Sequence, residues 1–173
     1  GCSSGEEPYS IAILLRNILP NINRWDIQIE ATDINLDLLE KAKAGKYRAW
    51  SFRTTDENIR STYFSNEGLD TWKIRDDIME MVSFSYLNLQ TDLTPGQISE
   101  SGQYDLIICR NVFIYFSEEV VKKVTSALFQ LLAGEGEFIT TPVESGLKIY
   151  KAFTACRHNG LTVYVKQADD SEP

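Results

Sequence analysis

The sequence predicts an α/β fold with a doubly wound sheet that ends in an antiparallel hairpin. Segments with strand-like alternation or short apolar runs take turns with segments of helical apolar spacing. Near the end of the chain, an Asn-Gly pair separates two further strand-like runs, which is typical of a tight hairpin. A glycine loop at the start of the chain leads into a helix, and ligands of such folds bind at this place.

Composition limits the class of protein. The chain has 173 residues, enough for one domain over residues 1–173 with a substantial core. Its net charge of −8 without a basic cluster argues against nucleic acid or an anionic membrane as a partner. Three cysteines at unrelated spacings and a single histidine favour a cytoplasmic protein with reduced thiols and no metal site. No apolar run approaches the roughly 18 residues of a membrane-spanning helix.

The glycine loop at residues 1–10 indicates the ligand. Gly1 and Gly5 flank three small residues, and glycine lets the backbone turn sharply and approach a ligand closely. Glu6 and Glu7 follow, and two carboxylates would repel a pyrophosphate but attract a cation. S-adenosylmethionine fits, because it carries a sulfonium, an ammonium and a ribose but no phosphate. A solvated acidic first turn of a helix is an equal alternative.

Periodicity and turn residues predict the other elements in order. We expect helices over 8–19, 36–44 and 118–133, strands over 25–33, 81–89, 104–109 and 137–141, a loop over 91–102, and a hairpin over 150–165 with its turn at Asn159-Gly160. A first strand should precede Gly1, so we expect the chain to be a fragment of a longer one.

Asp33 ends the strand predicted over 25–33. An acid at the tip of a second parallel strand can accept hydrogen bonds from both ribose hydroxyls. The alternative is that Asp33 caps the next helix, but Asn35 or Asp37 could form that cap instead. We favour a ligand role for Asp33.

Residues 46–80 are more aromatic and less periodic than their flanks. We expect a small insertion of short helices and a hairpin, with a turn at Asn66-Glu67-Gly68. The aromatic side chains mark either a binding surface or a small core under a long loop.

Two later strands also end in polar residues. Asn88 falls at the end of the strand over 81–89, where its amide could reach an adenine edge. The apolar run over 104–109 predicts a central, buried parallel strand, and Arg110 and Asn111 follow it directly.

Taken together, the motifs resemble the chemotaxis-receptor glutamate methyltransferases of the CheR type. The resemblance rests on GCSSGEEPYS at 1–10, ATDIN at 31–35, LEKAKAGKY at 39–47, YF at 63–64, NL at 88–89 and CRNVFIYF at 109–116. It implies a Rossmann-like, S-adenosylmethionine-dependent methyltransferase fold with a small inserted β-subdomain at 46–80.

The resemblance also implies an activity and a set of site residues. Such enzymes form glutamate methyl esters on chemoreceptors and release S-adenosylhomocysteine. Tyr115 and Arg110 match catalytic positions, where they could orient the substrate carboxylate. That carboxylate is ionised at neutral pH and is itself the nucleophile, so no general base is required. The cofactor-binding positions correspond to Gly1, Gly5, Glu6, Glu7, Asp33, Ile34, Asn88, Leu89, Arg110 and Asn111.

The sequence departs from the family at several points. The family's N-terminal helical region and an arginine before the glycine loop are absent. A Gly-His-Ser-Glu run is usual near the end, whereas this chain has Thr141-Pro142-Val143-Glu144 and retains only Glu144. The turn over 65–71 is short compared with members that grip a receptor's C-terminal peptide, so we expect no such tether. These departures motivate a noncatalytic S-adenosylmethionine-binding sensor as an alternative, and a small-molecule methyltransferase is a third interpretation.

Overall fold

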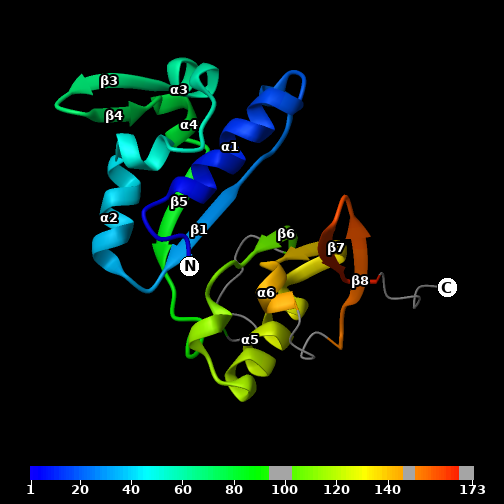
Figure 1. Ribbon diagram of the computed structural model, residues 1–173. Helices are drawn as coiled ribbons and strands as arrows, with labels where there is room; N and C mark the ends of the chain where they lie inside the picture. The colour runs from blue at the N-terminus through cyan, green and yellow to red at the C-terminus, as the bar shows by residue number, and fades with distance from the viewer. Residues whose placement is uncertain (94–102, 146–150, 168–173) are drawn as a thin grey trace. The chain divides into compact units, whose positions relative to one another are not determined.

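A computed structural model describes residues 1–93, 103–145 and 151–167 (Figure 1). The chain divides into two compact units. The first unit comprises Cys2–Leu87, and the second comprises Asn88–Pro173 together with Gly1. The tail after residue 167, most of the loop expected over 91–102 and the start of the predicted hairpin lie outside the described residues.

The first unit contains a parallel strand pair and a small antiparallel sheet. β1 and β5 pair in parallel, and their register places Asp33 opposite Tyr86. The small sheet has the strand order β2-β4-β3, and its β3–β4 hairpin projects at one edge of the unit (Figure 1). In sequence order the elements are α1 (Glu6–Ile18), η1 (Ile22–Arg24), β1 (Ile29–Asp33), α2 (Leu36–Ala44), β2 (Lys46–Arg48), η2 (Ala49–Phe52), α3 (Glu57–Tyr63), β3 (Phe64–Gly68), β4 (Thr71–Ile74), α4 (Asp76–Met79) and β5 (Val82–Tyr86).

The ends of α2 follow directly from its sequence. Asn35 caps the helix, because its side-chain oxygen accepts a hydrogen bond of 3.1 Å from the Leu38 N–H. Gly45 ends the helix in the left-handed conformation with φ of 61°, which glycine adopts without strain. The predicted helix over 36–44 is confirmed.

The aromatic residues of 46–80 form a small core. The ring of Phe52 lies 4.8 Å from that of Phe64 and 5.5 Å from that of Trp72, both edge-on. This favours the small-core interpretation, although Trp50 is 75% exposed. The short helices and the hairpin are present, but the expected turn at 66–68 is wrong, because these residues belong to β3 and the chain turns at Leu69-Asp70.

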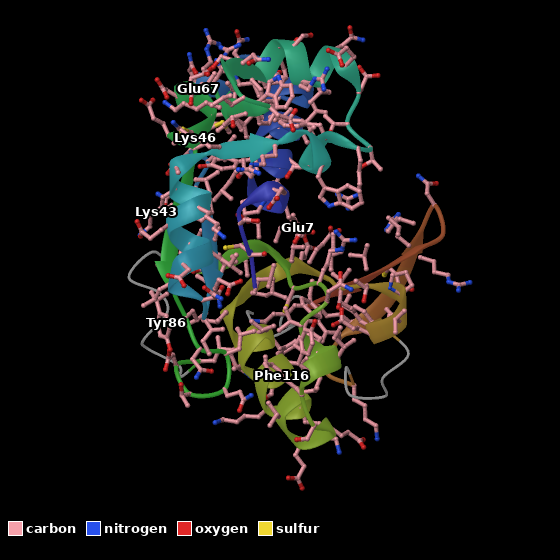
Figure 2. All side chains as sticks on the ribbon, turned by 60° about the vertical axis from the view of Figure 1, so that its left-hand side comes forward. Glu7, Lys43, Lys46, Glu67, Tyr86 and Phe116 are labelled. Atoms are coloured by element: carbon pink, nitrogen blue, oxygen red, sulfur yellow. The ribbon has the colours of Figure 1, made fainter. Side chains whose placement is uncertain are left out.

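An ion pair joins the two outer strands of the small sheet. The Lys46 ammonium on β2 lies 2.8 Å from the Glu67 carboxylate on β3. Figure 2 labels both residues. Both side chains are partly exposed, so this pair contributes at most about 1 kcal/mol to stability.

The second unit is built around a four-stranded mixed sheet. Its strand order is β6-β7-β9-β8, in which β6 and β7 are parallel and the other pairs are antiparallel (Figure 1). Asn159 and Gly160 both have positive φ at the hairpin turn, as the Asn-Gly pair predicts. The elements are β6 (Tyr104–Ile108), η3 (Phe113–Tyr115), α5 (Glu118–Leu131), β7 (Leu132–Ile139), α6 (Pro142–Ser145), β8 (Thr154–His158) and β9 (Leu161–Val165).

Two predictions for this unit are wrong. The run over 104–109 was expected to be central and buried, but β6 ends the order of the described sheet and Leu106 is 43% exposed. The residues 134–136 were expected to end the preceding helix, but they lie inside β7. Backbone hydrogen bonds of 2.9 Å join Glu135 and Gly136 to Lys166, so pairing with a distant segment overrides the local glycine signal.

Candidate cofactor and substrate site

The glycine loop of the first unit has a backbone that only a few residues tolerate. The Cys2 N–H donates to the Thr32 carbonyl at 2.9 Å, which ties the loop to β1. Ser3 and Gly5 have φ of 51° and 90°. A Cβ atom added at Gly5 would lie 2.9 Å from the Cβ of Ala42 on α2, which is a steric clash. Glycine is therefore required at this position by packing as well as by conformation.

Asp33 joins the loop to the end of β1. One carboxylate oxygen accepts a hydrogen bond of 2.7 Å from the Ser3 N–H, and the other accepts one of 2.9 Å from the Asn35 N–H. Asn35 caps α2, so the helix-cap alternative for Asp33 is wrong. Each carboxylate oxygen has a second acceptor position, which two ribose hydroxyls could use. The link from Ser3 to Asp33 was not predicted, because it joins residues 30 positions apart in the sequence.

Glu6 and Glu7 occupy the first turn of α1, where acids stabilise the positive end of the helix dipole. The Glu6 carboxylate accepts hydrogen bonds from the hydroxyls of Ser4 at 2.7 Å and Ser51 at 3.2 Å. Glu7 is half-buried near the start of the helix (Figure 2). Glu6 thus fastens the loop to η2, whereas Glu7 is the better candidate for contact with a cation.

Cys2 lies outside the predicted cofactor set, and the cavity beside α1 includes only Glu6 of that set. Burial raises the pKa of the Cys2 thiol to about 11, so this cysteine is not a thiolate at neutral pH. A cavity of about 260 Å³ lies against α1, lined by Glu6 and by aromatic side chains that include Tyr9 and Tyr47. Asp33 does not line this cavity.

In the second unit, Asn88 forms a tight turn. Its amide oxygen accepts a 3.0 Å hydrogen bond from the Gln90 N–H, and its own N–H donates to Asp92 at 2.8 Å. The amide NH₂ group is therefore the one suited to reach an adenine edge. Hydrogen bonds from Thr91 and the Asn88 backbone hold the pKa of Asp92 below its usual value. Asp92 was not predicted, and it positions Asn88.

Arg110, Asn111 and Tyr115 lie on one short segment between β6 and α5. Asn111 adopts a left-handed conformation with φ of 57°. All three side chains are exposed, and Tyr115 is 79% exposed. The two predicted catalytic residues, Arg110 and Tyr115, thus lie on the same segment as Asn111, and both Arg110 and Asn111 belong to the predicted cofactor set.

The backbone of this segment binds one buried carboxylate. Glu144 is 1% exposed and lies on α6. Its Oε1 accepts hydrogen bonds from the N–H groups of Val112 at 2.9 Å and Phe113 at 2.8 Å. Its Oε2 accepts one of 3.0 Å from the Asn111 N–H. Three successive amides that converge on one anion form a backbone nest.

Two threonine hydroxyls complete the surroundings of Glu144. Thr140 and Thr141 donate to Oε2 at 2.8 Å and 2.6 Å. Burial acts to raise the pKa of Glu144, but the hydrogen bonds from Thr141 and Thr140 and from the Asn111 and Phe113 amides outweigh it. The pKa is therefore lower than usual. In the sequence, Glu144 follows a pair of threonines at the predicted end of a strand. Nothing in the sequence indicated that Glu144 would bind the backbone of the segment that begins at Asn111.

The lowered pKa of Glu144 predicts a pH dependence of stability. A group with a lower pKa when folded stabilises the protein above its unfolded pKa, which is about 4.5 for this carboxyl. This stabilisation is lost as the pH falls through the folded pKa. We expect wild type to exceed Glu144→Gln in free energy of unfolding at pH 7, and the difference to shrink below about pH 4. Urea unfolding at several pH values measures this, and a difference independent of pH would contradict it.

Comparison with solved structures shows first the fold. A TehB-like SAM-dependent methyltransferase from Corynebacterium glutamicum superimposes with a TM-score of 0.53 over 98% of this chain and 77% of that chain, at 12% sequence identity. The chain therefore has the Rossmann-like fold of the S-adenosylmethionine-dependent methyltransferases.

The family follows from the sequence match. Residues 1–154 match the family described as "CheR methyltransferase, SAM binding domain", and the chain belongs to this family. It is 32% identical over 165 residues to "Chemotaxis protein methyltransferase 2" of Vibrio cholerae, covering 95% of this chain and 56% of that protein. It is 33% identical over 173 residues to "Chemotaxis protein methyltransferase" of Salmonella typhimurium, covering 96% and 56%. The chain thus spans about half the length of these relatives.

The predicted family and cofactor are confirmed at this level, because the family's domain is the one that binds S-adenosylmethionine. Within the described ranges, no three or more His, Cys, Asp or Glu side chains group so that they could hold a metal ion. No helix in the described part of the chain has both the length and the apolarity needed to cross a bilayer.

Proposed function

We propose that this chain is the catalytic domain of an S-adenosylmethionine-dependent protein-glutamate O-methyltransferase that acts on chemoreceptors. The observation that carries the proposal is the family match over residues 1–154. It is supported by related proteins from V. cholerae and S. typhimurium, which are named chemotaxis protein methyltransferases. Nothing in the comparisons favours the noncatalytic sensor.

The residues of the first unit suit this cofactor. The loop at 1–10 ends in two carboxylates and Asp33 has acceptor capacity beyond its two backbone hydrogen bonds, so a cationic nucleoside fits better than a phosphate. We propose that S-adenosylmethionine binds at the positions that the family resemblance implies: Gly1, Gly5, Glu6, Glu7, Asp33, Ile34, Asn88, Leu89, Arg110 and Asn111.

When bound, S-adenosylmethionine supplies an activated methyl group on a positively charged sulfur. The substrate glutamate is ionised at neutral pH, so the chain does not have to remove a proton from it. The chain instead has to hold the carboxylate of the substrate glutamate in line with the methyl carbon, which is catalysis by proximity. The exposed guanidinium of Arg110 and hydroxyl of Tyr115 are suited to orient that carboxylate.

The partner in this proposal is the cytoplasmic part of a chemoreceptor, which places the enzyme in the cytoplasm. We do not expect nucleic acid to bind, since the net charge is −8. We also propose that residues 46–80 act as a subdomain within a single catalytic domain over 1–173. The short β3–β4 turn at Leu69-Asp70 supports the expectation that no receptor C-terminal peptide is tethered there.

A methyl-transfer assay tests this function. The chain would be incubated with methyl-labelled S-adenosylmethionine and receptor cytoplasmic fragments, with fragments whose glutamates are replaced by alanine as the control. We expect label on the glutamate-containing fragments, released as methanol by mild base as an ester requires. Binding of S-adenosylhomocysteine by calorimetry without any transfer would reject the enzyme and favour the sensor.

A further inference from the structure

Glu144 is placed to act on the reaction without touching its participants. The side chain is 1% exposed, so neither substrate nor cofactor reaches the carboxylate. Its two oxygens already accept three backbone amides and two threonine hydroxyls at 2.6–3.0 Å. A carboxylate so fully hydrogen-bonded is not available as a base or a ligand.

The segment bound by Glu144 has an unusual backbone. Asn111 has φ of 57°, in the left-handed region that asparagine enters more readily than other residues with a side chain, and three successive amides of the segment point at one carboxylate. That conformation lets the amides of 111–113 converge on Glu144 while the Arg110 and Asn111 side chains remain exposed. Tyr115 follows two residues after the last of these amides. The carboxylate thus binds the backbone of the segment that carries all three side chains.

We propose that Glu144 is a positioning residue for methyl transfer, which acts through the Arg110–Tyr115 segment, and that the Thr140 and Thr141 hydroxyls hold its carboxylate in place. This rests on the proposed function. In this chain the Thr-Thr-Pro-Val-Glu sequence at 140–144, which departs from the family's usual run, supplies both the carboxylate and the two hydroxyls that donate to it.

A double-mutant cycle distinguishes positioning from general stabilisation. Glu144→Gln keeps the volume but replaces one acceptor oxygen by an NH₂ donor that faces backbone N–H groups. We expect turnover to fall roughly 10- to 100-fold, as for a lost hydrogen bond to a charged group. In an Arg110→Ala background, the same change should lower turnover by a clearly smaller factor, because one of the side chains that it positions is already gone. In an Asp33→Ala background, which removes a carboxylate from a different loop, the full factor should persist.

Milder variants guard against loss of folding. Thr141→Val removes the 2.6 Å donor to Glu144 at nearly constant volume, and we expect a smaller loss of turnover that is coupled to Arg110→Ala in the same way. Ser145→Ala on the same turn, whose hydroxyl donates to the Pro142 carbonyl instead, is the control and should leave turnover unchanged. Melting temperatures of all variants verify that each is folded.

Three outcomes decide between the ideas. Equal factors for Glu144→Gln in the wild-type and Arg110→Ala backgrounds would overturn the positioning role, as would a folded variant with unchanged turnover. The same double-mutant cycle can also be measured with the affinity for S-adenosylhomocysteine in place of turnover, and this needs no methyl transfer. A wild-type chain that binds S-adenosylhomocysteine but transfers no methyl group therefore rejects the proposed function, while the coupling of Glu144 to Arg110 is still measured.

Discussion

Replacing Asp33 with alanine is expected to weaken the binding of S-adenosylhomocysteine by about 1–3 kcal/mol, which is roughly 5- to 150-fold in Kd. Two effects contribute. The variant loses the acceptors proposed for the ribose hydroxyls, and it leaves the Ser3 and Asn35 N–H groups without their 2.7 Å and 2.9 Å partners. Because the Ser3 amide belongs to the glycine loop, the cofactor surface itself should become less ordered. Calorimetric titration measures the affinity.

Asp37→Ala is the matched control for this prediction. It removes one exposed carboxylate from the first turn of α2, only four residues further along, so net charge changes identically. Its affinity for S-adenosylhomocysteine should stay within about twofold of wild type, since surface substitutions away from a site have small effects. An Asp33→Ala affinity equal to that of Asp37→Ala would exclude the ribose role.

Replacing Tyr115 with phenylalanine is expected to lower methyl transfer by roughly tenfold or more, the usual range for a lost positioning hydrogen bond. The side chain is 79% exposed, so the fold does not depend on its hydroxyl. The affinity for S-adenosylhomocysteine and the free energy of unfolding should each stay within about 0.5 kcal/mol of wild type. Single-turnover rates with receptor fragments, measured together with calorimetry, separate these quantities.

Tyr63→Phe deletes the same atom where it has a structural partner. The Tyr63 hydroxyl donates to the side-chain oxygen of Asn17, and the residue is 6% exposed. This control should lose about 1 kcal/mol of stability and keep its transfer rate. Equal losses of turnover and affinity in Tyr115→Phe would instead assign that hydroxyl a structural part.

Local signals predicted the elements wherever the determining contacts are close in the sequence. Asn35 and Gly45 bound α2, and Ser117 caps α5 through the Val120 N–H at 3.4 Å. The Asn159-Gly160 turn likewise joins β8 and β9. The failure at 134–136 has the opposite cause, because backbone hydrogen bonds to Lys166, which is distant in the sequence, extend β7. At 104–109, the apolar run did not show that Leu106 is 43% exposed.

For the candidate site, too, some features could be predicted from the sequence and others could not. The residue types at the strand ends and the motifs at 1–10 and 109–116 were sufficient to identify the family and the nature of the cofactor. The sequence could not show that Asp33 binds the Ser3 amide, that Asp92 supports Asn88 or that Glu144 binds three amides of the Arg110 segment.

What the sequence by itself determined is therefore the family and the elements whose ends depend on nearby residues, such as α2, because these depend on residue type and short spacing. Only the tertiary structure decided which backbone groups those carboxylates hold. A carboxylate satisfies whichever N–H groups folding brings within about 3 Å of it, and pairs 30 or more residues apart leave no periodicity in the chain to reveal them.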